Sequence, residues 1–426
     1  MPRRHAPVHA VIGAGYGDEG KGLLVDALCA RLGPDTVVVR HNGGAQAGHT
    51  VQLPDGRRHV FHHVGAGSFA GARTHLSRFF VSNPILLGPE LAELARLGVV
   101  PRVTADERGA LSTPYDMLLN RLAEEARGDG RHGSCGIGFG ETIERNLHPS
   151  YALTLADLRG DLDDLARRLD RIRREWVPRR LTRLGLPDLY LRGRDAILSD
   201  DLLARFLGEC AAFLASVDLV RDLDEAAGPD APLVFEGAQG LGLDQDYGAF
   251  PHVTRSRTGL ANAAALAREL SRPPDRLEAV YATRAYVTRH GAGPLAHALP
   301  GAPWAGVVDE TNLPNAWQGG LRFGLLDLDV LAGAVRRDVA DATAALKVAH
   351  RLAVTCLDQI GGHATWMEGR EARKGGASDL AAAAGAAVGG EAPPLESRGP
   401  TRATLDGLSL APARSAGAGA ARRKAA

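Results

Sequence analysis

The order of hydrophobic and polar residues along the chain is typical of an α/β protein. Five short apolar runs have the length and the Val, Ile, Leu and Ala content of strands buried on both faces, at residues 8–12, 36–40, 232–236, 278–283 and 352–356. Segments with helical spacing of apolar residues predict helices at 21–32, 90–97, 115–127, 153–175 and 261–270. This alternation predicts an α/β fold with a mostly parallel central sheet.

The length of the chain fits one elaborated domain. With 426 residues it can bury a large core. We expect a single α/β domain over residues 1–412, with a helical insertion at about 151–230, where Arg, Asp and Leu recur at helical spacing. Residues 413–426 are rich in Ala, Gly and Arg, which predicts a flexible tail.

Charge and cysteine content exclude several classes of function. The 50 basic and 50 acidic residues cancel, so no overall field attracts nucleic acid or a membrane surface. No run approaches the roughly 18 apolar residues of a transmembrane helix, and the first strand comes too early for a signal peptide. The four cysteines are widely spaced, which indicates neither a disulfide framework nor a zinc site. We therefore expect a cytoplasmic enzyme without nucleic-acid or membrane partners.

The loop after the first predicted strand has the features of a phosphate-binding loop. Residues 15–22 read GYGDEGKG, and glycines let backbone N–H groups approach phosphate oxygens in front of a helix N-terminus. The spacing Gly15-x4-Gly20-Lys21 matches the P-loop pattern up to Gly22, which replaces the usual Ser or Thr that binds magnesium. Asp18 could take over that ligand role or act as a base. The loop predicts nucleotide chemistry.

Two other interpretations of this loop stay open. The glycines at 15, 17 and 20 also fit the dinucleotide-binding fingerprint. That fingerprint needs an acidic residue after the second strand, but Arg40 stands there, which would suit only the extra phosphate of NADP. An NADP oxidoreductase is therefore an alternative, and a plain glycine-rich turn is another.

Two further polar loops follow predicted strands. Residues 40–50 (RHNGGAQAGHT) belong at the carboxyl edge of the sheet, beside the loop at 15–22. Asp18 and His49 could there face one substrate as base and acid, although His49 alone would be read as a structural loop residue. Residues 235–254 present Gln239 and Thr254, whose amide and hydroxyl can contact a base edge and a phosphate.

Together these segments resemble the adenylosuccinate synthetase family, whose members phosphorylate the 6-oxygen of IMP with GTP and then install aspartate. The matching segments follow the family's order over nearly the whole chain, at residues 17–22, 42–50, 235–240, 288–294, 355–358 and 397–402. The resemblance implies a Mg²⁺-dependent C–N ligase that uses GTP or ATP, a purine nucleoside monophosphate and aspartate. It also implies a homodimer, because the family completes its site across a dimer.

The resemblance assigns roles to matched positions. Asp18 would remove the purine N1 proton and bind Mg²⁺ together with the Gly48 carbonyl, while His49 would assist at the 6-oxygen and Lys21 would hold phosphate. The remaining nucleotide contacts would be Gly17, Glu19, Gly20, Gly22, Asp358, Ser397, Gly399 and Pro400. The substrate contacts would be Asn42, Gln46, Ala47, Gly133, Ser134, Arg145, Gln239, Leu243, Thr254, Asn315 and Arg322.

Departures from the family pattern lie at the substrate contacts. Gln46 replaces an asparagine, and Arg145 is our only counterpart for the arginine that the family sends across its dimer. The amino-acid loop, residues 315–324, keeps only Arg322 to pair a carboxylate, and Cys356 replaces the lysine of the guanine-reading segment. The acceptor (IMP, GMP or dGMP), its sugar, the triphosphate and the amino acid stay open. A 2-aminoadenylosuccinate-synthetase-like enzyme, a nucleoside-antibiotic enzyme and a catalytically silent nucleotide-binding regulator are alternatives.

Overall fold

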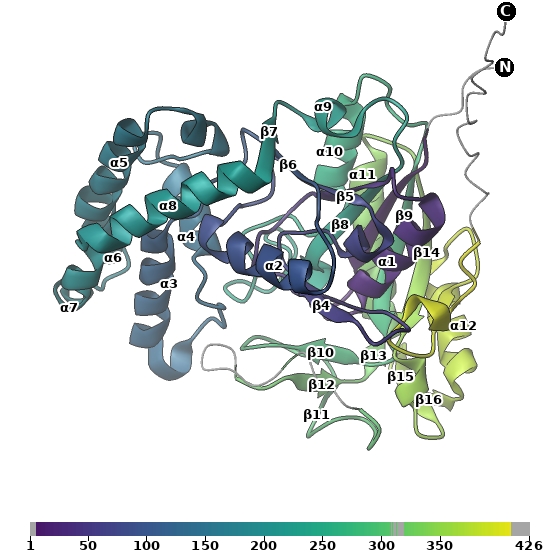
Figure 1. The fold of residues 1–426 in the computed structure, drawn as a ribbon. Helices are drawn as coiled ribbons and strands as arrows, with labels where there is room; N and C mark the ends of the chain where they lie inside the picture. The colour runs from purple at the N-terminus through teal and green to yellow at the C-terminus, as the bar shows by residue number, and fades with distance from the viewer. Residues whose placement is uncertain (1–5, 308, 310–311, 313–318, 410–426) are drawn as a thin grey trace, which may run out of the picture.

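A ten-stranded sheet forms the centre of the molecule (Figure 1). The computed structural model describes residues 6–307, 309, 312 and 319–409. The strand order is β18-β17-β14-β9-β1-β8-β2-β5-β6-β7. All neighbouring strands are parallel except β17 and β18. The prediction of an α/β fold with a mostly parallel central sheet is confirmed.

The five predicted strands are the five neighbours at the middle of this sheet. They are β14 (Val348–Thr355), β9 (Leu277–Arg284), β1 (Val8–Gly13), β8 (Leu233–Gly240) and β2 (Val37–Arg40). Central strands are covered on both faces, which is why they read as continuous apolar runs. The prediction missed the outer strands, which are shorter or carry polar residues: β5 (Arg73–Leu76), β6 (Val103–Asp106), β7 (Val217–Val220), β17 (Leu395–Ser397) and β18 (Leu405–Asp406).

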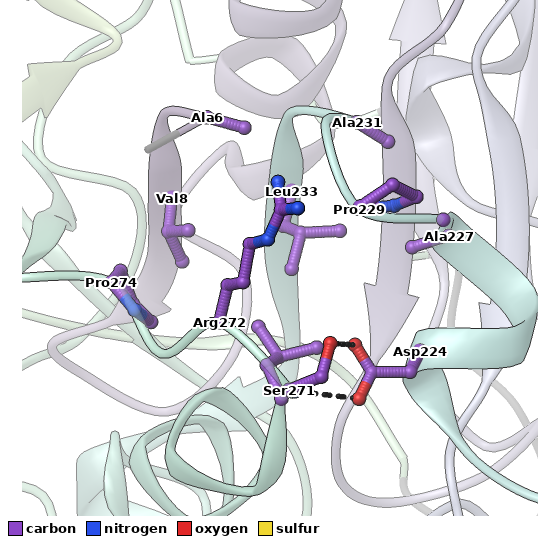
Figure 2. Close-up of a pocket in the computed structure, with 12 residues that line it drawn as sticks. Ala6, Val8, Asp224, Ala227, Pro229, Ala231, Leu233, Ser271, Arg272 and Pro274 are labelled. Atoms are coloured by element: carbon purple, nitrogen blue, oxygen red, sulfur yellow. Dashed lines mark hydrogen bonds between the residues drawn. The ribbon is translucent and has the colours of Figure 1, made fainter. Parts of the chain in front are cut away.

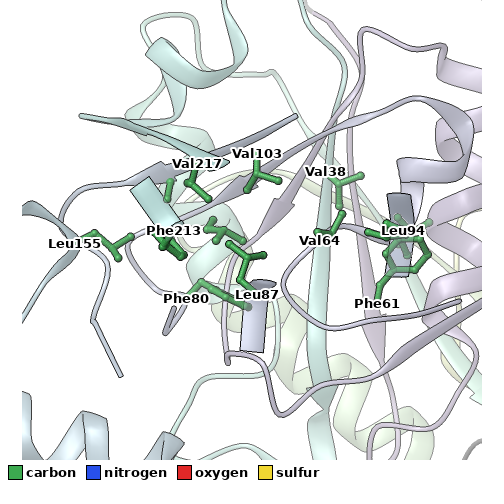
Figure 3. Close-up of a cluster of buried hydrophobic side chains, with 14 of the residues drawn as sticks. Val38, Phe61, Val64, Phe80, Leu87, Leu94, Val103, Leu155, Phe213 and Val217 are labelled. Carbon is green, nitrogen blue, oxygen red and sulfur yellow. The ribbon is translucent and has the colours of Figure 1, made fainter. Parts of the chain in front are cut away.

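Helices cover both faces of the sheet. Val11 of β1 packs in one hydrophobic cluster with α1 (Lys21–Leu32) and α2 (Pro84–Arg96), as expected from side chains that alternate along a strand. Figure 3 shows part of this cluster, including Val38, Phe80 and Leu87. The opposite cluster contains Ala10 and Ile12 together with side chains of three helices: α10 (Ala261–Glu269), α11 (Leu328–Thr343) and α12 (Ala377–Val388).

A group of helices extends the molecule beyond β6 and β7, at the left of Figure 1. Its helices are α3 (Pro114–Arg127), α4 (Phe139–Asn146), α5 (Leu162–Arg171), α6 (Val177–Arg183), α7 (Asp188–Ile197) and α8 (Asp200–Ser216). Trp176 is fully buried in the same cluster as residues of α1. The helical region therefore shares the core of the sheet. The predicted tail, 413–426, lies outside the described residues.

The prediction of one helix over 153–175 is wrong. A 3-10 turn (Leu155–Arg159) comes first, then α5, and then a π-helical turn (Ile172–Trp176). The first turn ends at Gly160, and Asp161 starts α5 as its N-cap, because its side chain accepts a hydrogen bond from Asp163 N at 3.0 Å. Helical spacing of leucines continues through the break and hides it from the sequence.

Smaller sheets complete the fold. The hairpin of β3 (His49–Gln52) and β4 (Arg58–Phe61) continues the loop after β2. A second small sheet consists of β10 (Val287–Arg289), β11 (Ala298–Leu299) and β12 (Arg322–Gly324), at the bottom of Figure 1. A third consists of β13 (Leu326–Asp327), β15 (Ala364–Glu368) and β16 (Glu371–Gly375). No helix in the described part of the chain is long and apolar enough to cross a membrane.

A pocket lies at the amino ends of β1 and β8, near Val8 and Leu233 (Figure 2). Its charged side chains already have partners inside the chain. The Asp224 carboxylate accepts hydrogen bonds from the N–H and hydroxyl of Ser271, and Arg272 pairs with Asp230 at 3.6 Å. In a parallel α/β sheet, ligands bind at the opposite, carboxyl edge. A functional site is therefore expected at the carboxyl edge.

Candidate active site

The loops that follow β1, β2 and β8 meet at the carboxyl edge of the sheet. The backbone N–H of Ala238 donates to the Asn42 side chain at 2.8 Å, and Gly242 N donates to Gly15 O at 2.8 Å. Although β8 lies between β1 and β2 in the sheet, the first two loops also touch directly, because Gly22 packs against Thr50. The sequence predicted these two loops as neighbours, and the loop after β8 contacts both of them.

Residues 15–22, here called the phosphate-type loop, are arranged around the Glu19 side chain. Oε1 of Glu19 accepts hydrogen bonds from Gly15 N at 3.0 Å and Gly17 N at 2.6 Å, and Oε2 lies 3.1 Å from Lys21 Nζ. Gly17 (φ +119°) and Gly20 (φ +81°) have backbone conformations that favour glycine. Two amides and an ammonium converge here on one carboxylate. Such a set of donors also suits a phosphate.

Gly22 is required by packing. A Cβ at this position would lie 2.5 Å from Thr50 O, so the first turn of α1 can approach β3 only with glycine there. A Ser or Thr at this position would push the His49–Thr50 backbone away from α1. The departure from the P-loop pattern therefore has a structural cause.

Asp18 lies beside a histidine that the sequence did not single out. Oδ2 of Asp18 is 3.5 Å from His290 Nε2, the Asp18 side chain is 20% exposed, and Arg284 donates to its backbone carbonyl. Burial raises the pKa of Asp18, although His290 and Arg284 favour its charged form. A raised pKa suits a general base. His290 lies in the matched segment 288–294, at a position where the family pattern allows any residue. The pattern therefore did not identify it, although it includes the neighbouring Arg289.

His49 lies between two fully buried charged side chains. Its Nδ1 is 2.6 Å from Glu236 Oε1 and 2.8 Å from Arg40 Nη1, and its Nε2 is 3.2 Å from Ala238 O. Burial lowers the pKa of His49 to about 4, against the attraction of Glu236. Burial alone would raise the pKa of Glu236, but Arg40 and His49 outweigh it and lower this pKa to about 2. Arg40 is fully buried, so it cannot hold a cofactor phosphate and the NADP interpretation fails.

Gln46 keeps both polar atoms of its side chain unpaired. Its Oε1 and Nε2 are buried and have no hydrogen-bond partner among the described residues. Nε2 lies beside Gly43 and Oε1 lies beside Gly44. A Cβ added at these glycines would be 3.3 Å from Nε2 and 3.0 Å from Oε1, respectively. Ala47 O accepts from His62 Nδ1 at 2.7 Å, and Gly48 is exposed. Buried polar groups without partners are rare, so Gln46 is a good contact for a polar ligand.

The third loop places Gln239 over the phosphate-type loop. A Cβ at Gly17 would lie 3.1 Å from Gln239 Oε1. The same loop folds back so that Thr254 N donates to Leu243 O at 2.9 Å. Three of the candidate substrate contacts therefore lie in one folded loop.

The loop at 131–138 binds a carboxylate of α3 through its backbone amides. The N–H groups of Gly133 and Ser134 lie 3.2 and 3.3 Å from Oε2 of Glu124, and Ser134 Oγ donates to Asn120 Oδ1 at 2.8 Å. A Cβ at Gly133 would lie 3.2 Å from Gly291 Cα. The loop is thus close in space to Gly291, the residue after His290, although about 150 positions separate them in the sequence, and its amides already bind an anionic group.

The hypothesis that Arg145 reaches across a dimer is wrong. Arg145 is completely buried, and it has an ion pair with Asp116 at 2.9 Å. The remaining donors bond to Leu111 O, Tyr151 O and Asn146 Oδ1 at 2.7, 2.7 and 3.0 Å. All five N–H groups of a guanidinium are then used inside the chain. Arg145 stabilises the start of the helical region.

Comparison with known proteins decides the family. The sequence model of the adenylosuccinate synthetase family matches residues 10–354. The chain belongs to the adenylosuccinate synthetase family. It is 32% identical over 294 residues to the synthetase of Oleidesulfovibrio alaskensis (67% of this chain, 64% of the relative). It is 29% identical over 364 residues to that of Clostridium beijerinckii (83% and 78%).

Solved structures share this synthetase fold. The fully ligated adenylosuccinate synthetase of Plasmodium falciparum superimposes with a TM-score of 0.71 at 18% identity, covering 94% of this chain and 99% of its own. The succinoaminodeoxyadenylate synthetase of cyanophage S-2L, bound to dGMP and to dATP as an energy donor, gives 0.60 at 18% identity, covering 94% and 95%. By sequence, this chain spans only 64% and 63% of the length of the synthetases of O. alaskensis and Tolumonas auensis.

The donor-base candidates of the synthetase pattern lie further along the edge, beyond β9, at the ends of β14 and β17. Asp358 is exposed just after β14, and Ser397 ends the parallel neighbour β17 and donates to Gly399 O at 2.9 Å. Pro400 is exposed beside them. Thr355 Oγ1 donates to Glu19 O at 3.1 Å, which connects this group to the phosphate-type loop.

The amino-acid candidates of the pattern are only partly described. Arg322 lies in β12 opposite Arg289 of β10, and its Nη2 donates to Gly293 O at 2.9 Å. Its guanidinium keeps further N–H groups for a ligand, because Nε has no partner among the described residues. Asn315 lies outside the described residues.

Proposed function

We propose that this chain is a Mg²⁺-dependent ligase that uses a nucleoside triphosphate to join aspartate to C6 of a purine nucleoside monophosphate. The observation that carries the proposal is the meeting of three loops at one sheet edge, with Asp18 and Lys21 on the first and His49 on the second. Membership of the adenylosuccinate synthetase family supports it.

The residues at this edge suit a two-step reaction. The 6-oxygen of the purine is a poor leaving group, so it first attacks the terminal phosphorus of the triphosphate while Asp18 takes the N1 proton. The bond from that phosphorus to the bridging oxygen breaks, and the nucleoside diphosphate leaves with the bond electrons. The amine of aspartate then attacks C6, and inorganic phosphate leaves with the C6–O bond electrons. His49 and Lys21 lie where they can stabilise the charge that develops on the oxygens, the kind of preorganised electrostatics that dominates many rate enhancements.

Magnesium fits the donors that these loops offer. Asp18 contributes one partly exposed carboxylate, and Gly48, an exposed residue of the neighbouring loop, would contribute its backbone carbonyl. Mg²⁺ prefers oxygen donors and usually binds one or two carboxylates together with substrate phosphates. Bound there, it would neutralise phosphate charge.

The choice of purine and triphosphate belongs to the same proposal. The phage synthetase was solved with dGMP and dATP. In this chain the departures from the family pattern lie at the corresponding contacts, with Gln46 at the purine and Cys356 at the donor base. We therefore propose IMP, GMP or dGMP as acceptor, with GTP or an adenine triphosphate as donor.

Phosphate release tests the proposal directly. The protein is mixed with Mg²⁺, aspartate and GTP, ATP or dATP, and IMP, dIMP, GMP and dGMP are added one at a time. Release that requires both purine and aspartate, with a succinylated product in the mass spectrum, is the expected result. Nucleotide binding without phosphate release in any mixture would overturn the ligase and favour the silent regulator.

We also propose a homodimer, as the family resemblance implies. Because Arg145 is committed inside its own chain, a partner subunit would have to complete the site with another residue. Light scattering gives the mass in solution, and a monomer with full activity would overturn this part.

A further inference from the structure

The buried partner of His49 is a candidate for a role that the family resemblance does not assign. We propose that Glu236, held by Arg40, is a positioning residue that fixes the His49 ring with Nε2 toward the reacting edge. The inference rests on the proposed function only for the role of His49, because the orientation of the ring can be measured without substrate.

The contact between Glu236 and His49 is short and directional. Nδ1 of His49 and Oε1 of Glu236 are 2.6 Å apart, a distance typical of a charge-assisted hydrogen bond. Nδ1 is therefore the nitrogen turned into the protein. Nε2 faces the other way, 3.2 Å from the carbonyl of Ala238, the residue just before Gln239. Nε2 thus lies on the side of the ring that faces the end of β8, and Arg40 Nη1 lies on the Glu236 side, 2.8 Å from Nδ1.

Glu236 itself is held from three directions. It is the fourth residue of β8, in register with Val11 of β1 and with Arg40 of β2. Its Oε2 accepts from Ala66 N at 3.1 Å and pairs with Arg40 Nη1 at 3.1 Å. A carboxylate fixed by packing and by further hydrogen bonds can hold a neighbouring ring within the narrow range of angles that catalysis needs.

Arg40 completes the support. Its Nη2 donates to His62 O at 3.0 Å, and its guanidinium lies over the Phe80 ring, 5.5 Å from the centroid. Arg40 and Glu236 are both fully buried. The ion pair therefore comes with a fixed geometry and without solvent around it.

Stability is a weak reason for this arrangement. The free energy needed to remove two charges from water offsets much of the free energy of their attraction. Apolar replacements of buried ion pairs therefore often leave stability unchanged or increase it. The pair instead places charge against one ring nitrogen of a candidate catalytic histidine. The arrangement resembles in logic the buried carboxylate that orients the histidine of a catalytic triad.

Two variants separate positioning from general structural support. Glu236→Gln keeps an oxygen that can accept from Nδ1, while Glu236→Leu removes it. We expect kcat to fall about 10²-fold in Glu236→Leu, since small misplacements of a reacting group cost about that much. The KM for the triphosphate should change less than twofold, and Glu236→Gln should recover most of kcat. Equal losses in both variants, or an unchanged kcat in Glu236→Leu, would overturn the inference.

A spectroscopic measurement tests the ring without any turnover. In protein with ¹⁵N-labelled histidine, His49→Asn identifies the His49 signals by difference. We expect Nδ1 of His49 to carry a hydrogen-bonded proton in the wild type and in Glu236→Gln, and to lose that signature in Glu236→Leu. If the wild type shows no proton on Nδ1, the inference fails, whether or not the ligase reaction is found. A silent assay with the expected spectrum would instead count against the proposed function alone.

Folding controls keep these outcomes interpretable. Asp338 is a matched buried carboxylate, because it accepts from the Tyr281 hydroxyl at 2.8 Å and from Leu260 N and has no contact with His49. Asp338→Asn should leave kcat and the His49 signals unchanged. If Glu236→Leu does not fold because Arg40 is left unpaired, the double variant Arg40→Met/Glu236→Leu removes both charges and takes its place, with the same expected loss of kcat.

Discussion

Lys21 Nζ lies 3.1 Å from Glu19 Oε2, inside the loop that the sequence identifies as a phosphate-binding loop. The other oxygen of this carboxylate accepts from the N–H groups of Gly15 and Gly17. Glu19 therefore occupies the donors that an incoming phosphate would use. A ligand with phosphate groups has to compete with a carboxylate that is already in place.

Removing this carboxylate should strengthen anion binding. We expect Glu19→Ala to bind pyrophosphate about tenfold more tightly than the wild type, since one buried competitor for two amides and an ammonium is gone. Isothermal titration calorimetry without purine or metal measures the difference. Glu371→Ala, at an exposed carboxylate in β16, should bind as the wild type does. Weaker binding by Glu19→Ala would mean that Glu19 organises the loop for the phosphate.

Replacing Asp18 tests the proposed base. Asp18→Asn should reduce turnover by about 10²–10⁴-fold, the usual contribution of a general base. Burial raises the pKa of Asp18, so removing its charge should leave the melting temperature unchanged or slightly higher. Phosphate release and thermal unfolding are measured on the same preparation. Near-normal turnover in a folded Asp18→Asn protein would remove Asp18 from the mechanism.

Arg322 should act on the amino acid. A hydrogen bond to a charged group contributes about 1.5–3 kcal/mol, so Arg322→Ala should raise the KM for aspartate about 10- to 150-fold. The KM for the triphosphate should stay constant, because Arg322 lies on β12 and not on the phosphate-type loop. Arg336→Ala, at an exposed arginine of α11, is the control. Loss confined to the triphosphate KM would contradict this assignment.

Acid should destabilise the fold through a buried histidine away from the candidate site. His75 is fully buried in β5, and burial lowers its pKa to about 4. The unfolded chain takes up this proton at about pH 6.5, so the stability from neutral His75 is complete above that pH and is lost as pH falls toward 4. From pH 7 to 5, His75→Asn should lose about 2 kcal/mol less unfolding free energy than the wild type.

Urea unfolding at the two pH values measures this difference. Asp26 and Asp338 have pKa values that burial raises to about 6, and they change stability with pH in the opposite sense. Both are present in wild type and variant, so they cancel in the comparison. The exposed His363 provides the control variant, His363→Asn. Parallel pH profiles for wild type and His75→Asn would show that the buried ring takes up a proton in the folded state.

Local sequence patterns were enough to predict the centre of the fold and the chemistry of the first loop. The five middle strands and the bounds of α1 follow from local patterns, because a strand covered on both faces must be apolar throughout. The glycine spacing before Lys21 likewise needs only the local backbone. The outer strands were missed because short, partly polar segments carry no such signal.

Which charged groups neutralise one another depends on how the chain folds. Glu236 meets His49 across 187 positions of sequence because β8 lies between β1 and β2, and no local pattern specifies that order. The same applies to His290 beside Asp18, and to Arg145, whose guanidinium is consumed within its own chain. The type of residue limits the possible chemistry, but strand order and burial determine the partner that each residue has.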